Sequence, residues 1–245
     1  MARRNLGDVL HYFISEEEQR EAREAARARA TPPLAQPSRA PRYCLPADPE
    51  RPLSCALALE LAGGMGAAGR PARVISSFPA SPLVPRVRCA SWEVCADPAV
   101  ALAAISDDVP AIAVERPARI GAMLGRIAAD GIDGVLLPVE LAAWGLGRAL
   151  GLLRELAPAL AGRRVLALVV GSDSPVAAAD LIARLSSAAR RQYGVGIELL
   201  GELARDEQSY RSLLRGESLH ALEDESATGR SLRALCQRLS QRLAA

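Results

Sequence analysis

The stretch RYCLPADPERPLSCALALELAGGMGAAGRPARVISSF, residues 42–78, decides the fold of this chain. Its apolar start predicts a buried β-strand, its Ala- and Leu-rich middle predicts a helix, and ARVISSF predicts a second strand. Further along the chain, short apolar runs keep alternating with helical runs, as they do in proteins built from β-α-β units. The expected fold class is therefore α/β, with a doubly wound, mostly parallel sheet flanked by helices on both faces.

The same alternation defines the expected elements as far as the C-terminus. Strands are predicted at residues 42–46, 72–78, 111–115, 134–139, 165–171 and 197–203, with 87–94 as a weaker candidate. Helices are predicted at residues 53–63, 97–105, 118–129, 141–157, 175–193, 207–215 and 226–242. VLALVVG, at 165–171, is apolar throughout, which is typical of a strand buried on both faces.

The segment GGMGAAGRP (63–71) matches two phosphate-binding motifs by its glycine spacing, G-x-G-x-x-G and G-x-x-x-x-G. A phosphate site requires a strand, a glycine loop and then a helix, because the first N–H groups of the helix face the ligand. Here the order is reversed, so we interpret the segment as a helix-to-strand turn in which Gly63 or Gly64 caps the helix in the left-handed conformation. The phosphate loop of such a fold is expected after the first strand, at PADPERPLSC (46–55).

Composition excludes several kinds of function. Lys+Arg number 30 and Asp+Glu 28, a net charge of +2, which gives no electrostatic reason to expect direct nucleic-acid binding. Every basic residue is Arg, so chemistry that needs a lysine is unavailable. The 5 Cys form no C-x-x-C pair, and His11 and His220 are isolated, so no metal site is predicted. Scattered cysteines and the lack of a long apolar run predict a cytoplasmic protein.

The segment 46–55 stands where the MinD/ParA-like P-loop ATPases have S-G-K-G-G-V-G-K-T-T, and the chain resembles that family from about residue 42 to residue 243. Members of the family position division sites, flagella and chromosomes and dimerise around ATP. The resemblance implies a P-loop NTPase-like fold. In that alignment Leu53 occupies the position of the P-loop lysine, and Asp48 occupies the position of the family's signature lysine. The degenerate phosphate-loop position comprises Asp48, Glu50, Arg51, Leu53, Ser54 and Cys55.

The resemblance continues in AIAVERPARIGAMLGRIAADGIDGVLLPVE (111–140), which is similar to the family's Switch-II block. Glu115 replaces the Switch-II Asp and Arg119 replaces the glycine that follows it. VLALVVGSD (165–173) is similar to the family's strand that ends in an adenine-reading Asn, and Gly171 stands at that place.

The tail, residues 197–239, is also similar to the family, although Ala204 replaces the family's proline. Four of its residues match the family's pattern at their positions, namely Gly201, Asp206, Gly216 and Ser226. Its last helix has one apolar face, and we interpret it as the last core helix rather than as an amphipathic membrane anchor. That face comprises Leu232, Leu235, Cys236, Leu239 and Leu243.

The residues of the degenerate loop are poorly suited to bind phosphate. Pro46, Pro49 and Pro52 have no backbone N–H to donate, and Asp48 and Glu50 repel anions. The leading hypothesis is therefore a non-catalytic regulator or scaffold in bacterial spatial organisation that needs no cofactor. The alternative is an active nucleotide switch that binds ATP and Mg²⁺ through an unorthodox loop, with Arg51 or Arg70 in place of the lysine.

An appendage is predicted ahead of the α/β domain at 42–245. Residues 1–30 are expected to be helical, with the apolar stripe Leu6, Val9, Leu10 and Phe13, and TPPLAQPSRAP (31–41) is a Pro-rich linker. Relatives that regulate flagellar number carry an N-terminal recruitment segment. By that resemblance the stripe is a candidate partner-binding site. The other interpretation, that the stripe packs on its own domain or on a second copy of the chain, stays open.

Overall fold

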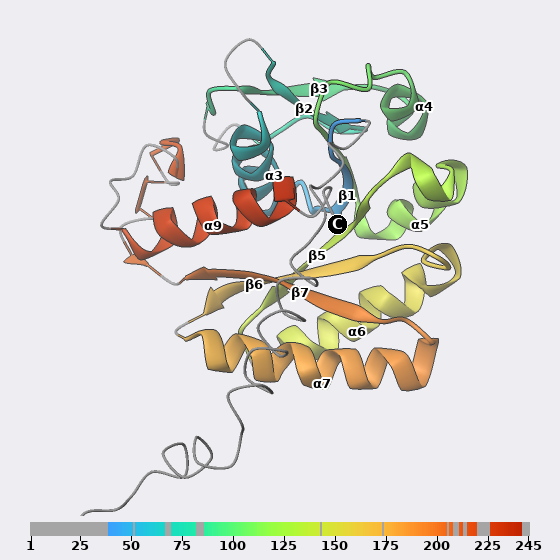
Figure 1. Cartoon of the computed structure of the whole chain (residues 1–245), viewed down its shortest axis with the longest axis vertical. Helices are drawn as coiled ribbons and strands as arrows, with labels where there is room; N and C mark the ends of the chain where they lie inside the picture. Colours follow the sequence, from blue (N-terminus) through green and yellow to red (C-terminus); the bar gives the residue numbers. More distant parts are fainter. Residues whose placement is uncertain are drawn as a thin grey trace, which may run out of the picture. The chain divides into compact units, whose positions relative to one another are not determined.

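In the part of the chain that the structure describes, seven strands form one sheet in which every neighbouring pair is parallel (Figure 1). The structure is a computed structural model. It describes residues 39–241 except 51, 67–69, 82–85, 143, 173, 205, 208–210, 213–214 and 220–225, and the side chains of 52, 53, 175 and 241 also lie outside the description. The strand order is β3-β2-β4-β1-β5-β6-β7. The strands are β1 (Arg42–Pro46), β2 (Ala72–Ser76), β3 (Ala90–Val94), β4 (Ala111–Glu115), β5 (Gly134–Glu140), β6 (Val165–Ser172) and β7 (Ile197–Ala204).

All six strands predicted from the sequence are present, as is the weaker candidate, so the predicted α/β fold class is confirmed. The helices are α3 (Pro52–Met65), α4 (Pro98–Ala103), α5 (Pro117–Arg126), α6 (Gly145–Leu156), α7 (Pro175–Tyr193) and α9 (Ala227–Gln241), with short 3₁₀ turns η1 (Ala129–Gly131) and η2 (Ala157–Ala159). The predicted extension at 1–30 and most of the linker lie outside the described residues. The predicted helix at 207–215 lies partly outside them.

The helix predicted at 141–157 begins only at Gly145. The residues before it form a turn at the end of β5, in which the N–H of Gly145 donates to the carbonyl of Ala142 at 2.9 Å. This turn brings the first residue of α6 directly against the end of the strand.

Two hydrophobic layers lie on opposite faces of the sheet, because successive strand residues point to opposite sides. In β1, Tyr43 and Leu45 pack in the layer covered by α3 and α9, whereas Cys44 packs in the layer covered by α4, α5, α6 and α7 (Figure 1). β6 is buried over most of its length, which confirms that its uniformly apolar sequence belongs to an interior strand.

The glycine-rich segment is the helix-to-strand turn predicted from its order, but the predicted cap is wrong. α3 continues through Gly63 and Gly64 to Met65, and neither glycine is among those with positive φ. The two additional helical residues bring the Met65 side chain into the core. The glycine that the structure requires is Gly66, because a Cβ there would lie 2.2 Å from the carbonyl oxygen of Cys89.

The C-terminal helix packs on the sheet, as predicted. Leu232, Leu235, Cys236 and Leu239 are at most 4% exposed and lie in the same layer as α3. Leu243 lies outside the described residues. Among the described residues, no helix has both the length and the apolar character needed to cross a bilayer.

The cysteines are all free thiols. Burial raises the pKa of the Cys44 and Cys236 thiols to about 12, so both stay protonated at neutral pH. These two side chains therefore behave as small apolar residues of the core.

Candidate functional site

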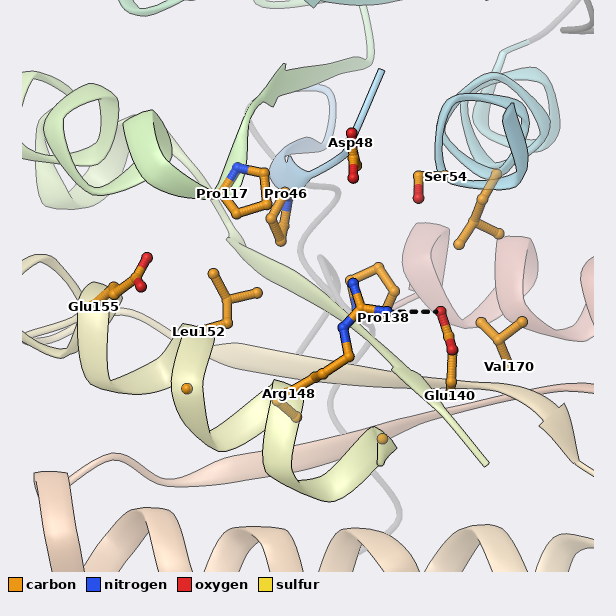
Figure 2. Close-up of a pocket in the computed structure, with 14 residues that line it drawn as sticks. Pro46, Asp48, Ser54, Pro117, Pro138, Glu140, Arg148, Leu152, Glu155 and Val170 are labelled. Atoms are coloured by element: carbon orange, nitrogen blue, oxygen red, sulfur yellow. Dashed lines mark ion pairs between the residues drawn. The ribbon is translucent and has the colours of Figure 1, made fainter. Parts of the chain in front are cut away.

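The carboxyl ends of the strands meet at one edge of the sheet, and a pocket of about 360 Å³ lies there (Figure 2). It is lined by the ends of β1, β5 and β6, by the first turns of α3 and α5, and by one side of α6. β1 lies between β4 and β5, and the chain passes from one side of β1 to the other when it leaves β4 for β5. Open α/β sheets bind their ligands at such a switch point, so this pocket is the candidate site.

The structure brings only part of the predicted phosphate-loop position to the pocket. Asp48 and Ser54 line it. Cys55 is fully buried and Glu50 is exposed, and neither lines the pocket. Arg51 and the side chain of Leu53 lie outside the described residues.

The loop between β1 and α3 uses two of its backbone donors within the protein. The Oδ1 of Asp48 accepts the N–H of Glu50 at 3.0 Å, and the N–H of Ala47 donates to the carbonyl of Glu115 at 3.0 Å. Pro46 and Pro49 have no N–H. Four of the five positions between Pro46 and Glu50 thus offer no backbone donor to a ligand, whereas a phosphate cradle depends on such donors.

The carboxylate at the Switch-II position is also engaged internally. Glu115 is only 2% exposed, and its Oε1 accepts the hydroxyl of Ser77 at 2.7 Å and the N–H of Arg116 at 2.8 Å. These bonds tie the end of β4 to the segment after β2. Glu115 does not line the pocket, and Arg119 is an exposed residue of α5 that does not line it either.

Solved structures share this architecture. MinD of Pyrococcus furiosus, a cell division ATPase, matches with a TM-score of 0.56 and 14% identity over 83% of this chain and 99% of that one. A chain of the MinC:MinD cell division protein complex of Aquifex aeolicus matches with a TM-score of 0.55 and 12% identity over 82% of this chain and 95% of that one. This chain has the MinD fold.

A putative plasmid partition protein of Borrelia burgdorferi B31, bound to AMPPNP, matches with a TM-score of 0.52 and 9% identity over 82% of this chain and 99% of that one. No protein-family model and no curated protein sequence matches the chain. The MinD fold is therefore established by structure, at sequence identities too low to carry function across.

Within the MinD fold, three charged residues of the pocket were missed by sequence reasoning: Glu140, Arg148 and Glu155. Figure 2 shows Arg148 reaching from α6 into the pocket, with Nη1 3.7 Å from Oε1 of Glu140. Both side chains are about half exposed, and such pairs contribute little to stability. A usable signal was present, because Glu140 ends a buried strand, and strand ends in this fold face the site.

Trp144 lies beside Glu140, does not itself line the pocket and is 61% exposed. Its indole Nε1 donates to Oε2 of Glu140 at 3.2 Å, so the hydrogen bond orients the ring. The bond satisfies the polar end of the indole, while much of its apolar part stays in water.

Two other predicted residues are not at the pocket of this MinD fold. Arg70 precedes β2 at the opposite, amino edge of the sheet and faces Asp108 at 3.9 Å, so its place in the alternative hypothesis is wrong. Gly171 has φ +78° and sits next to the pocket residue Val170 without lining the pocket itself. Among the described residues, no three His, Cys, Asp or Glu side chains are grouped so as to hold a metal ion.

The tail residues hold the end of the fold together. The hydroxyl of Ser226 donates to Oδ2 of Asp206 at 2.9 Å, and the hydroxyl of Thr228 donates to the carbonyl of Ala204 at 3.0 Å. Gly201 and Gly216 both have positive φ, which explains why glycine stands at these positions. These contacts join β7 to the start of α9 and lie outside the pocket.

Proposed function

We propose that this protein is a MinD/ParA-like protein without ATPase chemistry that acts as a non-catalytic regulator or scaffold in bacterial spatial organisation. The process is flagellum or pilus placement, division, segregation or exopolysaccharide secretion. The observation that carries the proposal is the loop between β1 and α3. It presents the carboxylate of Asp48 to the pocket, and the N–H groups of Ala47 and Glu50 are used in internal bonds.

The electrostatics of the loop support this proposal. A carboxylate about 4 Å from a phosphate charge costs on the order of 4 kcal/mol at the effective dielectric of a protein surface. A P-loop lysine would offset that cost, but the chain contains no lysine. The loss of backbone N–H donors and the added carboxylate of Asp48 both weaken the binding of a triphosphate.

Calorimetric titration of the full chain with Mg-ATP tests the proposal. We expect no saturable heat up to about 1 mM nucleotide, since the loop has no lysine, brings the carboxylate of Asp48 to the pocket and uses the N–H groups of Ala47 and Glu50 internally. Binding with a micromolar Kd would overturn the proposal. Turnover of ATP by the same sample would point to the nucleotide switch instead.

One observation favours that second candidate. Among the described residues that line the pocket, Arg148 is the only cation, and its guanidinium makes no contact there besides the long ion pair with Glu140. A nucleotide switch in this chain would use Arg148 to hold phosphate. Arg148→Met keeps most of the apolar stem and removes the charge, so it would abolish ATP binding if such binding exists.

We propose that the N-terminal extension supplies the contact with a protein partner. The neighbour of known structure from Aquifex aeolicus is a complex of MinD with the protein MinC, which supports the idea that this fold works by holding a partner. A homodimer through the same stripe is the competing arrangement. Direct nucleic-acid binding and membrane association are not part of the proposal.

Deletion of residues 1–30 should remove the partner and leave the melting temperature nearly unchanged, because the extension precedes the α/β domain. The measurement is quantitative pull-down from lysate with the full and shortened chains, together with thermal unfolding of both. Leu10→Asp in the full chain is the matched point variant, and Glu18→Gln is its control on the polar part of the extension. A fall in melting temperature of several degrees would instead favour packing of the stripe on its own domain.

A further inference from the structure

β3 forms one outer edge of the sheet, and among the described residues no strand pairs with its far side (Figure 1). The strand has 5 residues, an ordinary strand length, and the side chains of Ser91, Glu93 and Val94 are exposed. It contains no proline, and its pairing with β2 has no bulge. Its single charged side chain, Glu93, is paired with Arg73 at 3.4 Å. Natural sheets usually guard an open edge with lysine, proline or a bulge, so this edge is a template for another strand.

The hydrogen bonds to β2 show which backbone groups of β3 face outward. The carbonyl of Cys89 accepts the N–H of Ala72 at 2.8 Å, just before β3 begins. Just after it ends, the N–H of Cys95 donates to the carbonyl of Ser76 at 2.9 Å. Since alternate residues of a strand direct both backbone groups to the same side, the odd-numbered residues face β2. The outward groups belong to the even-numbered residues, namely Ala90, Trp92 and Val94.

A second copy of the chain is the partner that this edge fits. Its β3 can run antiparallel about a two-fold axis at Trp92, so that Trp92 faces Trp92 and Ala90 of each copy faces Val94 of the other. All outward N–H and carbonyl groups of the strand then gain partners. Any other two-fold register leaves at least one of the three outward residues beyond the end of the facing strand, so the register at Trp92 satisfies the most backbone groups.

The side chains are complementary in that register. On one face of the sheet the two indoles lie opposite each other, and the 57% exposed Val94 lies opposite the small side chain of Ala90. On the other face Glu93 lies opposite Ser91, whose hydroxyl is a donor for the carboxylate. An axis one residue further along would set Glu93 against Glu93, and like charges directly opposite each other are unfavourable.

We propose that two copies of this chain associate through β3, as an antiparallel pair centred on Trp92 that makes one continuous sheet. The contact is isologous, because each copy contributes the same edge. β2 and β4 separate β3 from β1 and the pocket, so the pocket of each copy stays open. The inference therefore goes beyond the proposed function and does not depend on whether the pocket accepts nucleotide.

Sedimentation velocity of the full chain over a series of concentrations tests the association. We expect a monomer–dimer equilibrium with a Kd on the order of 10–100 μM, since an interface built on such short strands is at the small end of the range. Val94→Lys should weaken the dimer at least about tenfold, because lysine on an edge strand opposes pairing. A chain that stays monomeric, or an unchanged Kd in Val94→Lys, would overturn the inference.

Val176→Lys is the matched control for that variant. Val176 is 72% exposed and belongs to α7, which packs on β6 and β7 at the other end of the sheet. The same substitution there should leave the Kd unchanged. Both variants replace exposed side chains, so their melting temperatures should stay close to that of the wild-type chain. Equal weakening by the two variants would show that added charge acts without regard to β3, which contradicts the proposed interface.

Cross-linking tests the register. Ser91→Cys and Glu93→Cys are made in separate chains that also carry Cys89→Ser and Cys95→Ser, and the two chains are mixed and oxidised with copper phenanthroline. The remaining cysteines are buried. In the proposed register residues 91 and 93 face each other with Cα atoms about 4.5–5.5 Å apart, within the range for a disulfide. Two copies of the same residue lie about 8 Å apart, beyond that range.

We expect the mixed disulfide between positions 91 and 93 to form at least about tenfold faster than either disulfide between like positions. Faster cross-linking of like positions would overturn the register. Deletion of residues 1–30 separates this interface from a homodimer through the apolar stripe, and the shortened chain should keep the Kd of the full chain. If the deletion abolishes the dimer whereas Val94→Lys leaves it intact, the interface is the stripe and the inference fails.

Discussion

Removal of residues 227–245 is expected to leave a chain that no longer folds cooperatively at 25 °C. The truncation takes away α9, whose side chains at Leu232, Leu235 and Leu239 are at most 1% exposed. Each buried leucine contributes about 1.5–3 kcal/mol. Their loss, together with exposure of the sheet face beneath them, is comparable with the whole stability of a domain, about 5–15 kcal/mol. Urea unfolding followed by circular dichroism measures the effect.

A smaller change to the same helix keeps the test open if the truncated chain cannot be purified. Leu235→Ala should lower the free energy of unfolding by about 2–5 kcal/mol, because Leu235 packs directly on Gly201 of β7 and leaves a cavity there. Gln237→Ala, at an exposed position of the same helix, should change it by less than about 0.5 kcal/mol. A membrane anchor would tolerate both the truncation and Leu235→Ala, so an unchanged transition in either would contradict the packing of α9.

Gly145→Ala is expected to lower the free energy of unfolding by at least about 3 kcal/mol. A Cβ on Gly145 would lie 1.9 Å from the carbonyl oxygen of Glu140 and 3.0 Å from its carbonyl carbon. Both atoms belong to the backbone at the end of β5, which pairs with β6 up to Glu140. The clash therefore cannot be relieved by rotating a side chain, and either the strand or α6 has to move.

Gly147→Ala is the matched control, two residues further along the same helix. Nothing lies within 4 Å of a Cβ at that position, so the substitution should stabilise the protein by about 0.5–1 kcal/mol through helix propensity. Urea unfolding of the two variants measures the difference. Equal stability of Gly145→Ala and the wild-type chain would show that α6 does not approach β5 this closely.

Most of the fold could be predicted from local patterns. The helix at 175–193 was predicted with its observed bounds, because Ser174 caps its start and Gly194, with φ +69°, ends it. The apolar face of α9 could also be predicted from the sequence, because the helical spacing of its apolar residues determines which side is buried. These signals are local, and each element carries its own.

The turn after α3 is a case in which local sequence patterns do not predict the required residue. Four glycines stand within seven residues there, Gly63, Gly64, Gly66 and Gly69, and each could end a helix. The structure requires glycine at position 66 because the carbonyl of Cys89, just before β3, approaches the backbone there. That approach depends on how β2 pairs with β3, and no pattern within the turn encodes it.

The sequence by itself determined that the loop of residues 46–55 lacks lysine and the glycines of a phosphate cradle, and that the chain alternates between strands and helices. Only the tertiary structure decided which side chains meet at the resulting pocket. Asp48 and Arg148 are a hundred residues apart and line one pocket because β1 and β5 pair in parallel and end at the same edge. Strand order and register are properties of non-local pairing, so the charge of the site appears only when the sheet is assembled.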